Sequence, residues 1–398
     1  MGKRLIILLG ILTLLAYGWP AWTRLNSISP KKETSFSSPP YFDQSVNPGP
    51  FIKHDFINPG AVGAMVHVGS ICEMTDEQLA AVWYGGTREG AKDVAIFFST
   101  KPPGINNSWS SPRVIVDRDL ATRELKRYIR KVGNPVLFSG PGKRLWLIYV
   151  SITVGGWSGS SLNVKASQDG GDTWTESQRL TLSPFFNISE LVKGRPLPLK
   201  TMGEHMNQEH FAVPIYHEFL GNFPEILWIS FFKDSGRIVY EKSRMAGGKS
   251  FIQPSIAVLN THSATAFYRS VSTDRRIAVA TTEDCGQNWT VPDYLDLPNP
   301  DSAVDALPLP EDCILLAFND SRNSREIMQL ALSKDGGQNW TRIRTLENSP
   351  NEEFSYPYMI RGRNGLIHLV YTWKRKRIKH LVFNEAWVEQ QVAGKLDK

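Results

Sequence analysis

Arg269 and Glu89 are the charged residues of this 398-residue sequence whose surroundings point most directly to chemistry. Arg269 follows the apolar run 264–268, where a guanidinium needs a partner to offset its burial, and a carboxylate ligand would supply one. Glu89 follows Arg88 in the loop 84–90, which contains three glycines. Because glycines permit a tight backbone path, we expect the Glu89 carboxyl at a loop tip and not in a core. A solvated Arg88–Glu89 surface pair is the alternative interpretation.

A repeated pattern, Ser/Thr-x-Asp-x-Gly-x-x-Trp, predicts the elements that position these residues. Intact copies occupy residues 167–174, 282–289 and 333–340. In each copy the Asp suits a hairpin turn, the Gly tolerates a positive φ, and the Trp packs as an anchor. Successive Asp residues are 115 and 51 residues apart, so the first gap fits two units of the second. One four-stranded propeller blade has this length, about 40 to 50 residues.

Two degenerate copies, at 99–109 and 243–251, bring the number of marked units to five. A closing blade shared by the two ends of the chain would make six. Short alternating apolar runs between turn residues agree with strands, and no long amphipathic helix is apparent.

The repeat is identified as the Asp-box of the sialidase (neuraminidase) superfamily, and the resemblance runs from about residue 60 to about residue 383. It implies an all-β fold, a six-bladed β-propeller with Asp-box hairpins that lie on the outside, away from the catalytic face. Propellers without glycosidase activity also carry Asp-boxes, so the function must be argued from other residues.

Retaining sialidases use a Tyr nucleophile helped by a Glu, a carboxylic acid as general acid/base, and an arginine triad that clamps the substrate carboxylate. The resemblance implies that Glu89 takes the acid/base position and that Asp93 opens the next strand. It also implies that Tyr356 is the nucleophile, with Phe354 in the competing frame. A phenol suits this reaction because it avoids the like-charge repulsion that a carboxylate nucleophile would meet.

Two positions depart from the family pattern. Gln253 occupies the place of the Glu that normally activates the tyrosine, and an amide cannot act as a base. Glu352 or Glu353 is the expected substitute. The first arginine of the triad falls on His67, which binds a carboxylate strongly only when protonated, so the pattern favours acidic pH.

The resemblance assigns the other two arginines of the triad to Arg269 and Arg325, with Arg322 as a rival for the second of these. Arg88 and Asn134 are further candidates for the lining of the same substrate-binding funnel. A turn or capping role is the alternative for Asn134.

The N-terminus predicts export. Lys3 and Arg4 precede a 15-residue apolar run, 5–19, which is typical of a Sec-type signal. Residues 1–23 are therefore expected to be a signal peptide or membrane anchor, 24–50 a linker, and 51–390 the sialidase-like propeller. The protein would be periplasmic, secreted, or attached to the membrane by an uncleaved N-terminal segment.

The formal charge of +6 is concentrated locally, for example in the basic run 374–377. Because these residues lie in strand-like and loop segments of an exported chain, acidic sugars or an anionic membrane are better partners than nucleic acid. Three cysteines, Cys72, Cys285 and Cys313, form no metal-binding spacing. No metal and no cofactor are expected.

The sequence thus predicts an exported, exo-acting, sialidase-like glycoside hydrolase that acts on an acidic or deoxy sugar of glycans. One alternative is a glycan-binding propeller that kept the pocket and lost catalysis. Another is a different carbohydrate-active enzyme on the same scaffold, such as a lyase or a rhamnosidase-type hydrolase that uses His67 as acid or base.

Overall fold

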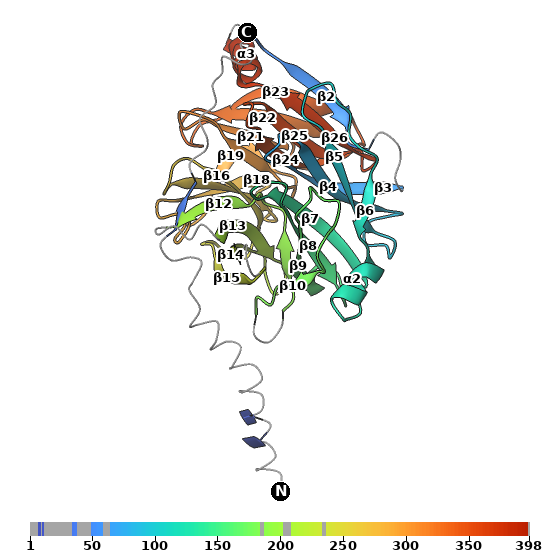
Figure 1. Cartoon of the computed structure of the whole chain (residues 1–398). Coiled ribbons are helices and arrows are strands. Elements are labelled where there is room, and N and C mark those ends of the chain that lie inside the picture. Colours follow the sequence, from blue (N-terminus) through green and yellow to red (C-terminus); the bar gives the residue numbers. More distant parts are fainter. Residues whose placement is uncertain are drawn as a thin grey trace.

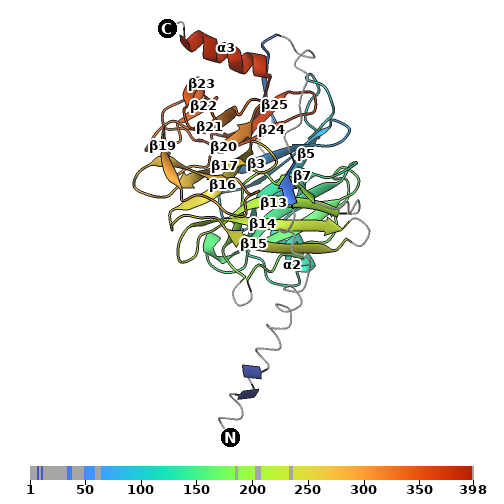
Figure 2. The same ribbon diagram turned by 90° about the vertical axis from the view of Figure 1, so that its left-hand side faces the viewer.

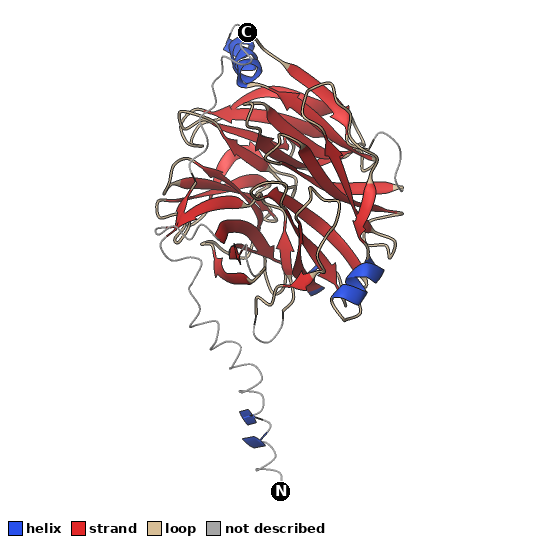
Figure 3. Cartoon of the chain, viewed as in Figure 1, coloured by secondary structure: helices blue, strands red, loops and turns tan. Residues whose placement is uncertain are grey.

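The computed structural model describes residues 7–8, 10–11, 34–37, 49–58, 64–183, 187–201, 208–232 and 236–396. Most of the predicted signal or anchor (1–23) and most of the predicted linker (24–50) lie outside the described residues. Within the described part, almost every regular element is a β-strand (Figure 3). No helix of this part is both long enough and apolar enough to span a lipid bilayer.

The strands form six antiparallel sheets, the blades of a propeller, arranged around one axis (Figure 1). Blade 1 contains β3 (Met65–Glu73), β4 (Leu79–Gly86), β5 (Ala95–Lys101) and β6 (Arg113–Val116). Blade 2 contains β7 (Lys131–Ser139), β8 (Leu145–Ile152), β9 (Ser160–Ser167) and β10 (Gln178–Arg179). Blade 3 contains β11 (Glu190–Val192), β12 (Leu197–Thr201), β13 (Gln208–His217), β14 (Phe223–Phe232) and β15 (Ile238–Arg244).

The second half of the ring repeats this order. Blade 4 contains β16 (Phe251–Val258), β17 (Ala264–Ser270), β18 (Arg276–Thr282) and β19 (Asp293–Pro298). Blade 5 contains β20 (Asp305–Pro308), β21 (Ile314–Asn319), β22 (Ile327–Ser333) and β23 (Thr341–Asn348). Blade 6 contains β24 (Phe354–Arg361), β25 (Ile367–Trp373), β26 (Arg377–Phe383) and β2 (Ile52–Phe56).

Blade 6 closes the ring because its outer strand comes from the other end of the chain. Strand β2 pairs antiparallel with β26, from Ile52 opposite Phe383 to Phe56 opposite Lys379. The prediction of six blades with a shared closing blade is therefore confirmed. One further N-terminal strand, β1 (Thr34–Phe36), pairs with β12, so this part of the range expected to be linker belongs to a sheet.

Two helices decorate the ring. Helix α2 (Arg118–Glu124) connects blades 1 and 2, and its N-terminus is capped by Asp117, which accepts a hydrogen bond from the Leu120 amide. Helix α3 (Glu385–Leu396) lies outside the ring next to β23 (Figure 2). A short 3₁₀ turn, η2 (Trp157–Gly159), interrupts the β8–β9 loop.

The apolar core lies between adjacent blades. Ile96 and Phe98 of blade 1, for example, pack with Leu147 and Tyr149 of blade 2, and all four are buried. This interlocking of neighbouring sheets fixes the blades relative to one another and gives the ring a rigid frame for residues at its ends.

The three intact Asp-boxes form equivalent hairpins between the third and fourth strands of blades 2, 4 and 5. In each, the Ser or Thr hydroxyl bonds the Asp carboxylate at 2.7–2.9 Å and accepts the amide of the Gly at 2.7–3.0 Å. The indole of Trp174, Trp289 or Trp340 donates to the carbonyl of the same Gly at 3.0 Å. The expected structural role of the repeat is confirmed.

In blades 1, 2, 4 and 6, the first strand has a bulge near its beginning that carries side chains toward the axis. The register shifts in β3, β7, β16 and β24 coincide with positive φ at Val68, Asn134, Gln253 and Tyr356, at +42° to +54°. Non-glycine residues seldom occupy this region, and bulges there re-aim side chains. The antiparallel register places these bulges at one end of the ring and the Asp-boxes at the other.

Candidate active site

The candidate site lies at the end of the ring opposite the Asp-boxes. Its charged residues come from four blades: Glu89 from the β4–β5 loop, Arg269 from β17, Arg325 from the β21–β22 loop, Glu353 from the residue before β24, and Arg375 from the β25–β26 turn. A closed ring brings such strand ends to a common axis although they are far apart in sequence.

Glu353 is the centre of the ionic network. Its carboxylate lies 3.3 Å from Arg325 Nη1 and 3.1 Å from Arg375 Nη1. Arg375 also forms an ion pair with Glu89, which joins the loop of blade 1 to the hairpin of blade 6. Partial burial raises the pKa of the Glu353 carboxyl, but the Ser355 hydroxyl, Arg325 and Arg375 outweigh it, so the pKa is lowered.

Arg269 and Arg325 meet at Tyr356. Arg269 Nε donates to Asp301 Oδ1 at 2.6 Å, and its Nη1 donates to the Tyr356 hydroxyl at 3.4 Å. The Arg325 guanidinium donates to the Asp301 carbonyl at 2.8 Å and lies 5.7 Å from the centre of the Tyr356 ring. Two guanidinium groups, those of Arg269 and Arg325, thus contact one half-buried tyrosine, and Arg375 joins them through Glu353, which also binds Arg325.

His67 is present in the cluster but does not supply its positive charge. The imidazole is buried, its Nδ1 lies 3.1 Å from the Thr372 hydroxyl, and its ring packs edge-on against Tyr356 at 4.6 Å. Burial and then the nearby Arg375 lower the pKa of His67 to about 3. This environment does not favour the protonated His67 that the sequence led us to expect, and a third guanidinium, that of Arg375, lies in the same ionic network.

Gln253 and Asn134 form a polar floor beneath Arg269. The Gln253 amide accepts from Arg269 Nη1 at 3.3 Å and donates to the Tyr216 hydroxyl at 3.0 Å. Asn134 donates to the same hydroxyl at 3.3 Å. Both amides are buried, so the bulges that carry them place hydrogen-bonding groups under the cluster.

The expected activation of Tyr356 by Glu352 or Glu353 differs from the observed contacts. Glu352 forms an ion pair with Lys374 at 3.1 Å. Glu353 binds arginines, and within the described residues the Tyr356 hydroxyl has its hydrogen bond with Arg269. The strong guanidinium charges on either side of Glu353 explain why its carboxylate turns to them and not to the phenol.

Asp93 and Arg88 lie outside the cluster. The Asp93 carboxylate accepts from the Thr87 amide and hydroxyl, both at 2.9 Å, and so holds the loop that carries Glu89. Arg88 is exposed on that loop. The structure therefore brings together Glu89, Tyr356, Glu353, His67, Arg269, Arg325, Gln253 and Asn134, and separates Asp93 and Arg88 from them.

Sequence reasoning missed four members of the site. Asp301 and Tyr216 bind the predicted residues as described above, and Glu218, whose pKa is raised by burial, lies near Arg269 and Asp301. Arg375 sits in the tight β25–β26 turn with a φ of +53°. The usable signal was positional: this turn joins the second and third strands of a blade, as the Glu89 loop does, and therefore faces the same end of the ring.

Comparison with known proteins supports this assignment of the fold. Residues 77–369 match the BNR repeat-like domain. The chain belongs to this family. The predicted membership of the sialidase/BNR-repeat superfamily is thereby confirmed. Among curated protein sequences, none matches this chain.

Several solved structures share the fold of this BNR repeat-like protein. The Hadza microbial sialidase Hz136 is 14% identical with a TM-score of 0.61; the match covers 80% of this chain and 66% of that one. The NanB sialidase from Streptococcus pneumoniae is 11% identical with a TM-score of 0.60, and the match covers 86% of this chain and 72% of that one. An intramolecular trans-sialidase from Ruminococcus gnavus, solved with oseltamivir carboxylate, is 14% identical with a TM-score of 0.61, and the match covers 84% of this chain and 98% of that one.

Proposed function

We propose that this protein is an exo-acting, sialidase-like glycoside hydrolase for glycans that end in an acidic or deoxy sugar. The observation that carries the proposal is a cluster of three guanidinium groups, in which Arg269 and Arg325 contact Tyr356 and Arg375 joins them through its ion pair with Glu353. Guanidinium groups recognise a carboxylate through paired hydrogen bonds, and a sugar carboxylate is the ligand that fits such a group.

A sugar carboxylate would compete with the carboxylates of the site for its arginines. Each of the three arginines already has a carboxylate partner: Arg269 binds Asp301, Arg325 binds Glu353, and Arg375 binds Glu353 and Glu89. A sugar carboxylate that binds Arg375 would take the place of Glu89 and leave the Glu89 carboxyl facing the glycosidic bond.

In the proposed reaction, the Tyr356 oxygen attacks the anomeric carbon while Glu89 protonates the departing glycosidic oxygen. The Tyr356 proton passes to solvent water, because the arginines hold Glu353, and the Arg269 hydrogen bond supports negative charge on the phenolic oxygen during attack. Ionised Glu89 then takes a proton from a water molecule, whose oxygen attacks the anomeric carbon. The glycosyl–tyrosine bond breaks, the sugar is released, and the Tyr356 oxygen regains a proton from solvent.

Release of free sugar from a panel of oligosaccharides ending in sialic acid, uronic acids or deoxy sugars tests this function. Tyr356→Phe and Glu89→Gln should each abolish release and leave ligand binding largely intact, because both changes preserve shape. Tyr128→Phe and Glu176→Gln, at exposed positions, are the matched controls and should retain activity. Full turnover by Tyr356→Phe would exclude the tyrosine mechanism.

A glycan-binding propeller is the second candidate. Gln253 in place of a catalytic base and the engagement of Glu353 by arginines favour it. Binding of an acidic sugar by the wild-type protein without release of any product from the panel would select this function over the hydrolase.

We also propose that the protein is exported, a proposal supported by the basic and apolar residues at its N-terminus. Fractionation of cells that produce the full chain should place it in membrane or extracytoplasmic fractions. Recovery in the soluble cytoplasmic fraction would contradict export.

A further inference from the structure

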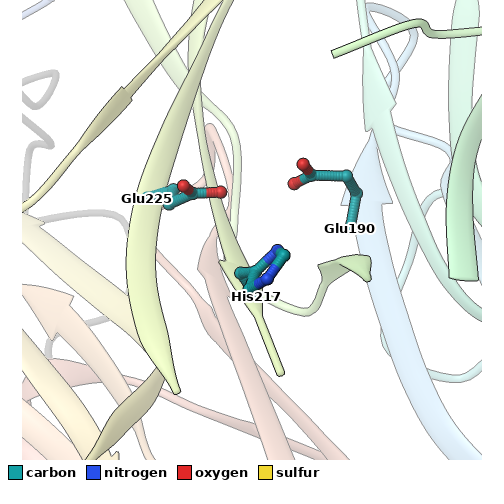
Figure 4. Close-up of side chains that lie close together, drawn as sticks. All are labelled: Glu190, His217 and Glu225. Atoms are coloured by element: carbon teal, nitrogen blue, oxygen red, sulfur yellow. The ribbon is translucent and has the colours of Figure 1, made fainter. Parts of the chain in front are cut away.

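Blade 3 carries a group of potential metal ligands that the proposed reaction does not use. Glu190 on β11, His217 on β13 and Glu225 on β14 each offer one ligand atom, and these atoms lie within 4.8 Å of one another. Figure 4 shows both carboxylates and the imidazole turned toward a common space. Glu190 and Glu225 are buried, and His217 is half-buried.

The strand register explains why the three side chains meet. Glu190 pairs directly with His217 across the β11–β13 ladder, and Glu225 pairs with Ile215, two residues before His217, across the β13–β14 ladder. Residues two apart on a strand point to the same face of a sheet. All three side chains therefore project from one face of blade 3.

The imidazole of His217 is held in a form that can bind a metal. Its Nε2 lies 2.7 Å from the Phe219 carbonyl, and because a carbonyl only accepts, Nε2 carries the proton. The Nδ1 lone pair is buried without a hydrogen-bond partner. An imidazole fixed by a backbone carbonyl through one nitrogen commonly ligates a metal through the other.

Glu190 provides a second potential metal-ligand atom without a hydrogen-bond partner. Its side chain is 1% exposed, and its Oε2 is buried without a partner, whereas its Oε1 bonds Lys242 Nζ at 2.5 Å. A buried carboxylate oxygen that lacks a partner is costly, so a nearby cation would stabilise it.

Lys242 is the competing explanation for the cluster. Its ammonium lies 3.0 Å from Glu225 as well, and Arg244 lies 3.6 Å from the same carboxylate. This arrangement partly neutralises both glutamates, but it leaves Glu190 Oε2 and His217 Nδ1 unused. The Lys242 side chain is 23% exposed, and its flexible stem can move its ammonium toward solvent.

We propose that Glu190, His217 and Glu225 form a binding site for a divalent transition-metal ion such as Zn²⁺. Two carboxylate oxygens and one imidazole nitrogen suit Zn²⁺, Co²⁺ or Mn²⁺ better than Ca²⁺ or Mg²⁺, which prefer oxygen ligands. The ion would join three strands of blade 3. His217 follows Tyr216, whose hydroxyl binds Gln253 and Asn134, so the ion would also steady the floor of the candidate site.

Titration calorimetry of the full chain, treated with a chelator and then titrated with Zn²⁺, tests the proposal. We expect one ion per chain in the wild type. Loss of a direct ligand in His217→Ala or Glu190→Gln should weaken binding by more than the about 10- to 100-fold that loss of an outer-shell partner costs. His262→Ala, at an exposed histidine of blade 4, is the matched control and should bind as the wild type does. Lys242→Met removes the competing ammonium and should bind more tightly.

A Co²⁺ titration gives a second readout, because visible absorption bands report a nitrogen- and oxygen-ligated site and should disappear in His217→Ala. Should Glu190→Gln fail to fold, His217→Ala still allows metal binding to be compared with the wild type, because His217 is half-buried and its replacement should disturb the fold less. Absence of stoichiometric binding to the wild type would overturn the proposal, and so would binding that His217→Ala leaves unchanged. Lys242 would then be the resident counter-ion of the two glutamates.

Discussion

Arg375 is the residue on which the proposed carboxylate recognition depends most directly. Its guanidinium lies 3.1 Å from Glu353 and also pairs with Glu89. At this distance and an effective dielectric constant of about 20, one such ion pair corresponds to about 5 kcal/mol of gross Coulomb energy. A ligand carboxylate exchanges with an existing partner, so the net gain is that of a charged hydrogen bond, about 1.5–3 kcal/mol.

Arg375→Met should therefore weaken the binding of acidic monosaccharides about 10- to 150-fold. Calorimetry with sialic acid, glucuronic acid and oseltamivir carboxylate measures this loss. Arg377→Met is the control on the same hairpin, because the Arg377 guanidinium lies over the Phe56 ring at 4.9 Å and outside the cluster. Its affinities should stay within about twofold of the wild type, as surface changes do.

Two results would refute the reasoning. Unchanged affinity in Arg375→Met would show that the carboxylate binds away from this guanidinium. An equal loss in both variants would show that the hairpin as a whole, and not the charge of Arg375, supports binding.

Three other predictions concern stability and catalysis. The pKa of His67, lowered from 6.5 to about 3, means that the unfolded chain takes up the proton first, so stability falls as the pH drops from 6.5 toward 3. His67→Gln should reduce the change of unfolding free energy with pH by about 1.4 kcal/mol per pH unit. Denaturant unfolding at several pH values between 3 and 6.5 measures this change, and an equal pH dependence in the variant and the wild type would contradict the pKa assignment. Asp335→Ala removes the acceptor of the Asn339 and Gln338 amides, at 2.9 and 3.0 Å, and should lower the free energy of unfolding by about 1–3 kcal/mol without changing ligand affinity. Asp296→Ala, at an exposed position, is the control. Equal melting temperatures of the two variants would count against the structural role of the Asp-box. Gln253→Glu adds a carboxylate beside Arg269 and should raise the rate of sugar release about tenfold or more, whereas a fall in kcat would show that the site does not lack a base there.

The sequence was sufficient for the architecture because the Asp-box is a local structure. Ser333, Asp335, Gly337 and Trp340 bond one another within eight residues, so the pattern specifies its hairpin without help from the rest of the chain. The spacing of such units then gives the length of a blade. The degenerate copy at 243–251 runs from the end of β15 to the start of β16 and joins blades 3 and 4, so it does not mark a blade as the intact copies do.

The sequence also located part of the site. Arg269 stood out because a charge follows an apolar run, and Glu89 because glycines surround it. Both side chains lie in the cluster that the structure shows. Their partners could not be read in the same way: Glu89 pairs with Arg375, 286 residues further along the chain. No local pattern encodes that distance.

Only the tertiary structure decided which charges share the site. Pairing of β2 with β26 closes the ring and sets the hairpin of blade 6 beside the loop of blade 1, which makes Arg375 the third guanidinium. The same closure buries His67 and lowers the pKa of its imidazole, because desolvation disfavours the charged form. The ligand atoms of blade 3 likewise meet through strand register alone. Residue types and local spacing are properties of the sequence, whereas proximity and burial, which set charge, arise when distant strands pair.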